Sequence, residues 1–172
     1  MDLTELNELD RDAFTAAVGS VFEASPWVAV RAWDRRPFES VAALHDAMTG
    51  VVAAATSDEQ LALIRAHPDL AGHAAIAGEL TADSTHEQAV AGLDRLTPDQ
   101  FARLTELNAA YRQRFGFPFV ICAREHAAES IIAAATRRLA HDPAEERRTA
   151  LDEIAKIARL RLDDLVDDTV KR

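Results

Sequence analysis

Cysteine is almost absent from this chain: Cys122 is the only one, which excludes an internal disulfide. It lies in the apolar run from Phe117 to Ala123, where a small buried hydrophobe is the commoner role and a nucleophile the rarer one. Basic charge is also scarce, since the formal net charge is −10. The chain therefore lacks the basic surface that a nucleic-acid-binding protein needs. An anionic small molecule is not excluded, because one arginine in a pocket can bind a carboxylate.

No apolar run is long enough to cross a bilayer, so we expect no membrane partner. The first residues, Met1 to Asp10, are acidic and polar and do not have the charged-then-apolar pattern of a signal segment. The sequence thus predicts a cytoplasmic protein. With 172 residues, of which 48% are apolar, it also predicts one folded domain over residues 1–172.

Glycine and proline are few, with six of each, and alternation with a period of two is nearly absent, so the pattern favours helices. A first helix is indicated by an apolar stripe at helical spacing, and a second by the alanine-rich range 41–55. The stripe consists of Phe14, Ala17, Val18, Val21 and Phe22.

Helix boundaries are marked by capping signals. A capping box at Ser57 and Gln60 predicts a helix that stops near Ala66, because the residue before Pro68 is pushed out of helical geometry. Thr97 to Gln100 repeats the signal for a helix that ends at Gly116, and the range 142–145 opens the last long helix. We expect an all-α, single-domain bundle of about seven to nine helices, with one short, extended and buried segment near 117–123.

Arg161 is out of place on the last helix. At about 100° per residue it falls between Ile154 and Ile157, inside the apolar arc of that helix. A buried guanidinium needs an anion. A protein carboxylate is the commoner partner and a bound ligand the rarer one, and the sequence leaves both open.

His67 lies between the end of a predicted helix and Pro68, at a junction of the kind where functional groups are often placed. The alternatives are a surface histidine or a charge partner of the helix C-terminus. Ser84 and Glu87 have the spacing of a capping box. They could also offer a hydroxyl, a helix N-terminus and a carboxylate to an anionic ligand. Asn108, on the core face of its helix, is expected to be a satisfied buried amide.

Other chemistries find little support. His67, His73 and His86 contain no pair at i, i+4 spacing on a clear helix, and no pattern of supporting carboxylates accompanies them, so we expect no metal site. The Gly-x-Ser-x-Gly elbow of serine hydrolases is missing, and so is a glycine-rich phosphate loop.

Several motifs occur in a characteristic order and spacing between about residue 14 and residue 166. They are Phe22–Ala29, Arg36–Phe38, Gln60–Leu61, Ile64–Gly72, Leu80–Gln88, Ala91–Asp94, Leu107–Tyr111, Arg114–Cys122 and Glu153–Val166. Together they resemble the 2-oxo-4-hydroxy-4-carboxy-5-ureidoimidazoline (OHCU) decarboxylases. The resemblance implies an all-helical homodimer that converts OHCU, a small molecule, into (S)-allantoin and carbon dioxide. This is the last step from urate to allantoin, and the resemblance implies that it uses neither metal nor organic cofactor.

The resemblance also implies roles for particular residues. His67 resembles the catalytic acid or base, Glu87 its carboxylate partner, and Arg161 the group that binds the anionic end of the substrate. The remaining substrate-binding positions that it implies are Pro68, Ser84, Thr85, His86, Gln88, Phe119, Val120, Ile121, Cys122 and Ala123, together with Glu87 and Arg161 themselves.

These residue types suit the reaction. Loss of carbon dioxide leaves an electron pair that the substrate's own carbon–nitrogen double bond can accept, so an added electron sink is unnecessary. Histidine suits the proton transfer because its ordinary pKa lies near the working pH. Two alternatives stay open: a non-catalytic helical interaction module, and a decarboxylase of a related ureido or carboxylated heterocycle. The first would be marked by replacement of His67, Glu87 or Arg161, and none is replaced.

Overall fold

The structure is a computed structural model that describes residues 1–168, apart from the side chains of His73 and Ala74. Within these residues it contains ten α-helices and two short 3₁₀ helices, and the one β-type pairing is an isolated bridge between Asp2 and Asp167. The all-α expectation is confirmed. The number of helices exceeds the expected seven to nine because short elements such as α1 (Leu3–Glu8) and α6 (His73–Ala77) are too brief to display an apolar period.

The contacts within the chain group into two units. One comprises Met1–Ala66 and Ala155–Arg172, the other His67–Ile154, and the long helix α10 (Pro143–Leu165) supplies residues to both. One domain over residues 1–172 stays a prediction.

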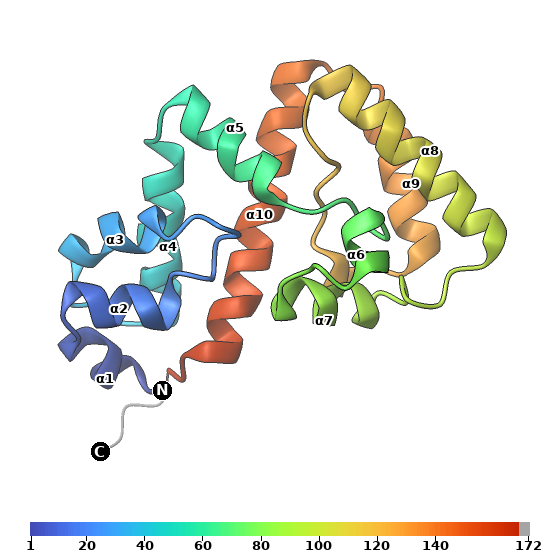
Figure 1. Cartoon of the computed structure of the whole chain (residues 1–172). Coiled ribbons are helices and arrows are strands. Elements are labelled where there is room, and N and C mark those ends of the chain that lie inside the picture. Colours follow the sequence, from blue (N-terminus) through green and yellow to red (C-terminus); the bar gives the residue numbers. More distant parts are fainter. Residues whose placement is uncertain (169–172) are drawn as a thin grey trace. The chain divides into compact units, whose positions relative to one another are not determined.

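The first unit contains α1 and four further α-helices, followed by the end of α10 (Figure 1). These helices are α2 (Arg11–Val18), α3 (Trp27–Ala32), α4 (Val41–Ala53) and α5 (Ser57–Ala66), with the 3₁₀ helix η1 (Trp33–Arg35) after α3. Helix α3 packs against both α2 and α4. The predicted apolar stripe is buried except for Ala17, which is half-buried. Its helix ends earlier than expected: Val21 and Phe22 follow in a turn, with Val21 N donating to Val18 O at 3.3 Å.

Helix α5 ends at Ala66, as predicted, but its cap differs from the prediction. The capping box is formed by Thr56 and Glu59, since Thr56 N donates to Glu59 Oε2 at 2.9 Å and Glu59 N donates to Thr56 Oγ1 at 3.3 Å. Gln60 instead donates to Val52 O at 2.8 Å and so ties α5 to the end of α4. The prediction placed this cap one residue too late, because two overlapping stretches carry the same spacing.

The second unit contains α6, three further α-helices and the start of α10. These are α7 (Ala82–Val90), α8 (Pro98–Phe115) and α9 (Ala128–Arg138), with the 3₁₀ helix η2 (Ala123–Glu125) before α9. Helices α8 and α9 lie side by side (Figure 1). The predicted cap of α8 is confirmed: Thr97 and Gln100 form a capping box, and Gly116 ends the helix in the left-handed conformation at φ 74°.

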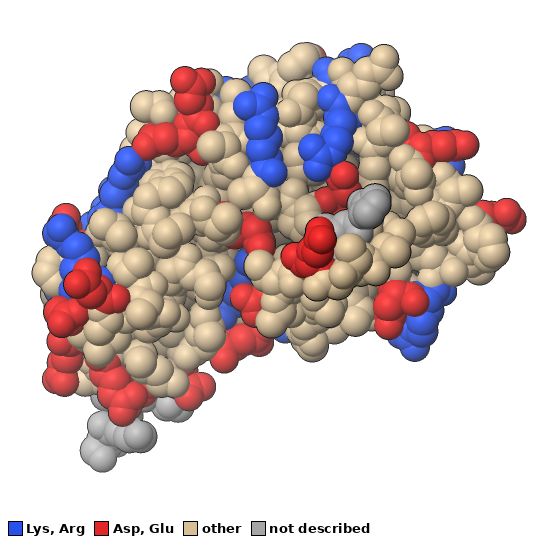
Figure 2. Space-filling model, in the orientation of Figure 1, with Lys and Arg blue, Asp and Glu red and all other residues tan. Residues whose placement is uncertain are grey.

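The prediction of a buried, non-helical segment near 117–123 is confirmed as far as Cys122, and Ala123 already belongs to η2. Between α8 and η2 the chain is neither helix nor strand, and its side chains from Phe119 to Cys122 are buried. None of the described helices is both long and apolar enough to span a membrane. On the face drawn in Figure 2, basic side chains lie among acidic ones and do not form one continuous basic surface. This mixture fits a protein whose formal net charge is −10.

Candidate functional site

The loop that carries His67 is held by side chains from two helices. His67 follows α5 directly and is 6% exposed. Gln88 on α7 accepts a hydrogen bond from Ala71 N through Oε1 at 2.9 Å, and Asn108 on α8 donates from Nδ2 to Leu70 O at 2.9 Å. Ala71 has a positive φ of 49°. This conformation costs free energy in a residue that has a Cβ, and it persists only where the surrounding structure enforces it. The loop is therefore built by its neighbours and not by its own backbone preference.

Asp69 and Gly72 complete this loop. Arg112 on α8 donates from Nε to both carboxylate oxygens of Asp69, at 2.9 and 3.0 Å. Gly72 turns so tightly that a Cβ there would lie 2.7 Å from the Cβ of Asp69, which explains the glycine. The motif around His67 thus encodes a tight turn as well as a histidine.

Helix α7 presents a buried polar face. Ser84, Glu87 and Gln88 are buried, at i, i+3 and i+4, while Thr85 and His86 are exposed. The capping prediction for Ser84 was wrong. The cap is Thr81, which accepts from Ser84 N through its hydroxyl at 3.2 Å, so Ser84 already lies within the first turn. The spacing of Ser84 and Glu87 therefore places them on one helix face, which is a different consequence of the same pattern.

The predicted substrate wall, Phe119 to Ala123, is buried throughout. Its backbone is held from both sides: Cys122 N donates to Glu153 Oε2 at 2.8 Å, and Val120 O accepts from Arg138 Nη1 at 2.9 Å. Helix α7 packs against η2, where this wall ends. Helix α7 therefore lies beside the end of the wall segment within the second unit.

Arg138 was not identified from the sequence. It is 4% exposed, and its guanidinium binds both carboxylate oxygens of Glu146 and stacks 4.6 Å from the ring centre of Phe119. Burial raises the pKa of the Glu146 carboxyl, and the Glu153 carboxylate acts in the same direction, while the Arg138 cation opposes both by stabilising the ionised form. Burial also lowers the pKa of Arg138 to about 10.

A sequence signal for Arg138 was present. It lies seven residues after Ile131 and four after Ala134, on the buried stripe of α9. This is the same misfit that singled out Arg161.

Arg161 lies in the first unit and is 3% exposed. Its Nη1 is 3.0 Å from Oε2 of Glu23, which is also buried, and it makes longer contacts with the carbonyl oxygens of Ser20 and Val21, at 3.4 and 3.5 Å. A protein carboxylate, the commoner of the two alternatives for this arginine, is therefore present. The sequence contained Glu23 within a motif but gave no indication that it would contact a residue on the last helix.

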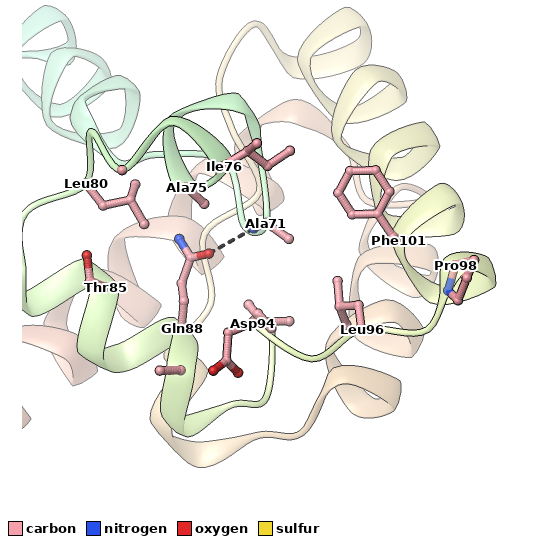
Figure 3. A pocket seen from close by; sticks show the side chains of 13 residues that line it. Ala71, Ala75, Ile76, Leu80, Thr85, Gln88, Asp94, Leu96, Pro98 and Phe101 are labelled. Carbon is pink, nitrogen blue, oxygen red and sulfur yellow. Dashed lines mark hydrogen bonds between the residues drawn. The ribbon is translucent and has the colours of Figure 1, made fainter.

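A cavity of about 640 Å³ lies beside the His67 loop, within the second unit (Figure 3). Its wall is mostly apolar, and Gln88 projects into it from α7 (Figure 3). The Nε2 atom of Gln88 is buried without a hydrogen-bond partner among the described residues. The wall is formed by Ala71, Ala75, Ile76, Gly78, Leu80, Thr85, Gln88, Ala89, Leu93, Asp94, Leu96, Pro98 and Phe101.

Asn108 departs from expectation. Its Nδ2 binds Leu70 O, but among residues 1–168 its buried Oδ1 has no hydrogen-bond partner, and the same is true of the hydroxyl of Tyr111 one turn later. The amide was predicted to be satisfied, and it is satisfied at one end only. Candidate metal ligands do not gather either: the described residues contain no group of three suitable side chains. The side chain of His73, one of the three histidines considered, lies outside the described part.

Similarity to known proteins extends over most of the chain. The family model of OHCU decarboxylase matches residues 7–163. An OHCU decarboxylase of Haloferax volcanii is 46% identical over 162 residues, which cover 94% of this chain and 94% of that protein. One of Halalkalicoccus jeotgali is 43% identical over 165 residues, 96% of this chain and 92% of that protein. Among solved structures, an (S)-allantoin synthase is 27% identical with a TM-score of 0.79, and the match covers 97% of this chain and 55% of that one.

Proposed function

The chain belongs to the OHCU decarboxylase family, and on this premise we propose how its residues carry out the reaction of that family. The protein is a carboxy-lyase of urate degradation that converts OHCU into (S)-allantoin and carbon dioxide. The observation that carries this assignment is similarity along nearly the whole chain to proteins named OHCU decarboxylase.

His67 is the proton-transfer residue in this proposal. The bond between the ring carbon and the carboxylate breaks, carbon dioxide leaves, and the electron pair passes into the adjacent carbon–nitrogen double bond of the substrate. The neighbouring ring carbon, which bears the ureido group, must then receive a proton from one side for a single enantiomer to form. The hydroxyl on the decarboxylated carbon gives up its own proton and becomes the carbonyl of allantoin. Histidine is suited to this because it exchanges a proton near neutral pH. The buried loop of His67, anchored from α7 and α8, supports the role because proton delivery to one side requires a fixed imidazole.

Glu87 is proposed to orient His67. It is a buried carboxylate in the same unit, and its neighbour Gln88 holds the backbone of the His67 loop. A carboxylate beside an imidazole fixes which ring nitrogen carries the proton and favours the charged form. Ser84 shares its buried helix face, and the Phe119–Ala123 segment supplies an apolar wall. Exclusion of water there would favour the loss of the charged carboxylate as neutral carbon dioxide.

Arg161 is proposed to bind the substrate carboxylate. Its guanidinium is planar and always charged, and its fork of donors matches the geometry of a carboxylate. Its contact with Glu23 through Nη1 fixes its orientation and supports a role in which the cation is set in place before substrate arrives. No metal or organic cofactor enters this scheme.

The test is the formation of optically active allantoin from freshly generated OHCU, followed by circular dichroism. The wild-type protein should accelerate the signal, and His67→Ala should lower kcat by about 10²- to 10⁴-fold, the usual contribution of general acid–base catalysis. His45→Ala is a matched control: this half-buried histidine of the first unit contacts Ala155 O at 2.8 Å through Nε2, and its loss should affect stability alone. Equal, racemic drift with and without the wild-type protein would instead favour the non-catalytic module.

A homodimer and a cytoplasmic location are further proposals. The first is supported by the family resemblance, and the second by the composition of the chain. A related ureido or carboxylated heterocycle as an additional substrate is also compatible with these residues, and competition against OHCU in the same assay distinguishes it.

A further inference from the structure

We infer that Asn108 is a positioning residue for the decarboxylation: it holds the loop of the proton-transfer histidine in place through the carbonyl of Leu70. This inference rests on the proposed role of His67. Asn108 lies on α8, is 8% exposed, and donates from Nδ2 to Leu70 O at 2.9 Å.

The loop between Pro68 and Gly72 is held at each of three successive residues. Arg112, one turn after Asn108 on α8, binds the carboxylate of Asp69; Asn108 binds Leu70; and Gln88 on α7 binds Ala71. These anchors differ in exposure, since the side chain of Arg112 is 48% exposed while Asn108 and Gln88 are buried. Bonds shielded from water are the stronger constraint, so the backbone position is set mainly by the two amides.

The loop needs such a constraint. Ala71 sits at φ 49°, which is unfavourable for a residue with a Cβ, and the following turn at Gly72 is tight. Without its anchors the backbone would relax toward an ordinary conformation. Leu70 lies three residues after His67, so such a relaxation would move the imidazole relative to Glu87 on α7.

Asn108 is a poor choice for stability alone. Its Oδ1 is buried without a hydrogen-bond partner among the described residues. Folding therefore removes water from both Nδ2 and Oδ1, but only Nδ2 gains a hydrogen bond in exchange. An apolar side chain of similar volume would avoid that loss. The asparagine is explained by what its Nδ2 holds, which is the backbone of the loop.

The decisive variant is therefore Asn108→Leu. It removes the bond to Leu70 and also removes the unsatisfied oxygen, so the melting temperature should stay within a few degrees of the wild type or rise. The value of kcat should fall by about tenfold, because small displacements of a catalytic group can cost up to about a hundredfold in rate. KM should change by less than about twofold, since the proposed carboxylate contact is made by Arg161.

Product chirality gives a readout that a purely structural role would not alter. With enzyme added in inverse proportion to kcat, so that background decay contributes equally, Asn108→Leu should yield allantoin of lower enantiomeric purity than the wild type. A misplaced imidazole delivers its proton to both sides more evenly, whereas a destabilised enzyme that folds correctly does not.

The variant Asn108→Asp tests the donated hydrogen directly. A neutral carboxyl at this position can donate to Leu70 O, and an ionised one cannot. The ratio of its kcat to that of the wild type should therefore rise as the pH falls. The corresponding ratio for Asn108→Leu should stay level over the same range.

Asn7→Leu is the matched control. Asn7 ties a loop of the first unit in a similar way, with Nδ2 donating to Phe38 O at 2.9 Å and Oδ1 accepting from Phe38 N at 2.8 Å. Because both Nδ2 and Oδ1 of Asn7 are hydrogen-bonded, the Asn7→Leu enzyme should be less stable than the wild type and keep the wild-type kcat. An Asn108→Leu enzyme with wild-type kcat and wild-type enantiomeric purity would overturn the inference, and so would a fall in kcat matched by the fraction unfolded. A wild type that does not accelerate OHCU decay would instead overturn the proposed function.

Discussion

The pair formed by Arg161 and Glu23 shows how one residue can serve stability and binding together. Both side chains are nearly inaccessible to water, at 4% and 6% exposure, and their charged atoms lie 3.0 Å apart. A buried pair of this kind adds little to stability compared with apolar residues, but removing one member leaves a charge in the interior. The effect of an Arg161 substitution on folding therefore has to be separated from its effect on activity.

Arg161→Leu alone should lower the free energy of unfolding by about 3–5 kcal/mol, because Glu23 stays buried without that cation. The double variant Glu23→Leu with Arg161→Leu should recover most of this loss, as measured by urea denaturation. Activity should stay absent in both, because the proposed carboxylate contact is missing in each. If the stabilised double variant regains decarboxylase activity, Arg161 serves the fold and not the substrate.

At the level of the element, helix starts show what local sequence can and cannot decide. The cap of α8 was predicted at the right residues because Pro98 follows Thr97 and fixes the first turn. The cap of α7 was misplaced because Thr81 and Ser84 can both accept from an amide three residues on. Ser84 belongs to a face that is buried. Tertiary packing therefore determines which of the two residues caps the helix, and the local sequence pattern alone does not.

The start of α5 offers a pH test. The Arg31 guanidinium on α3 donates to Glu59 at 2.6 Å and, with the backbone hydrogen bond from Thr56, holds the pKa of the Glu59 carboxyl at about 2, below its usual 4.5. Because the folded state lowers this pKa, the resulting stability is present above about pH 4.5 and is lost as the pH falls toward 2. Glu59→Gln should therefore flatten the acid side of the melting-temperature profile in that window.

The effect should be small, since Glu59 is exposed and solvent screens the pair. Glu39→Gln, at another exposed position of the first unit, removes the same charge and serves as the control. If the melting temperatures of the two variants fall in parallel below about pH 4.5, the proposed role of the Arg31–Glu59 pair is contradicted.

At the scale of the whole molecule, the second unit depends on ionic contacts that join distant parts of the sequence. Arg138 on α9 binds Glu146 on α10, the carbonyl of Val120 and the ring of Phe119. Together with Glu153, which accepts from Cys122 N, it fixes a segment that lies outside the helices as far as Cys122. The sequence predicted that this segment is extended and buried. The spacing of apolar residues within a segment does not indicate which distant residues will contact it.

Arg138→Met should lower the free energy of unfolding by up to about 3–5 kcal/mol, because it removes the Arg138 cation and leaves the buried Glu146 carboxyl to the ring Nδ1 of His141, 2.9 Å away. It should also raise KM, since the wall segment loses the bond at Val120. Arg137→Met, at the exposed neighbouring position, should stay within about 0.5 kcal/mol of the wild type. Urea titration and steady-state kinetics provide both values. Equal stability of the two variants would show that the ion pair is dispensable.

The same limit applies to the candidate site. The resemblance supplied His67, Glu87 and Arg161. Within the first unit the structure added Glu23 as the partner of Arg161. Within the second unit it added Asn108 and Gln88 as anchors of the His67 loop, and Arg138 as an anchor of the wall segment. These act through tertiary contacts, some of them between residues more than one hundred positions apart. The sequence indicated that Asn108 and the misfit arginines are buried, but it did not indicate which residues they contact. The homodimer and the cytoplasmic location stay predictions.

Cys122 has a consequence of a different kind. Its thiol, 1% exposed, is the only one in the chain and lies in the wall segment held by Arg138 and Glu153. A thiol reagent can reach it only when this segment opens, so the rate of alkylation counts openings of the wall directly. Alkylation of Cys122 can therefore report local unfolding of the wall segment without an engineered label.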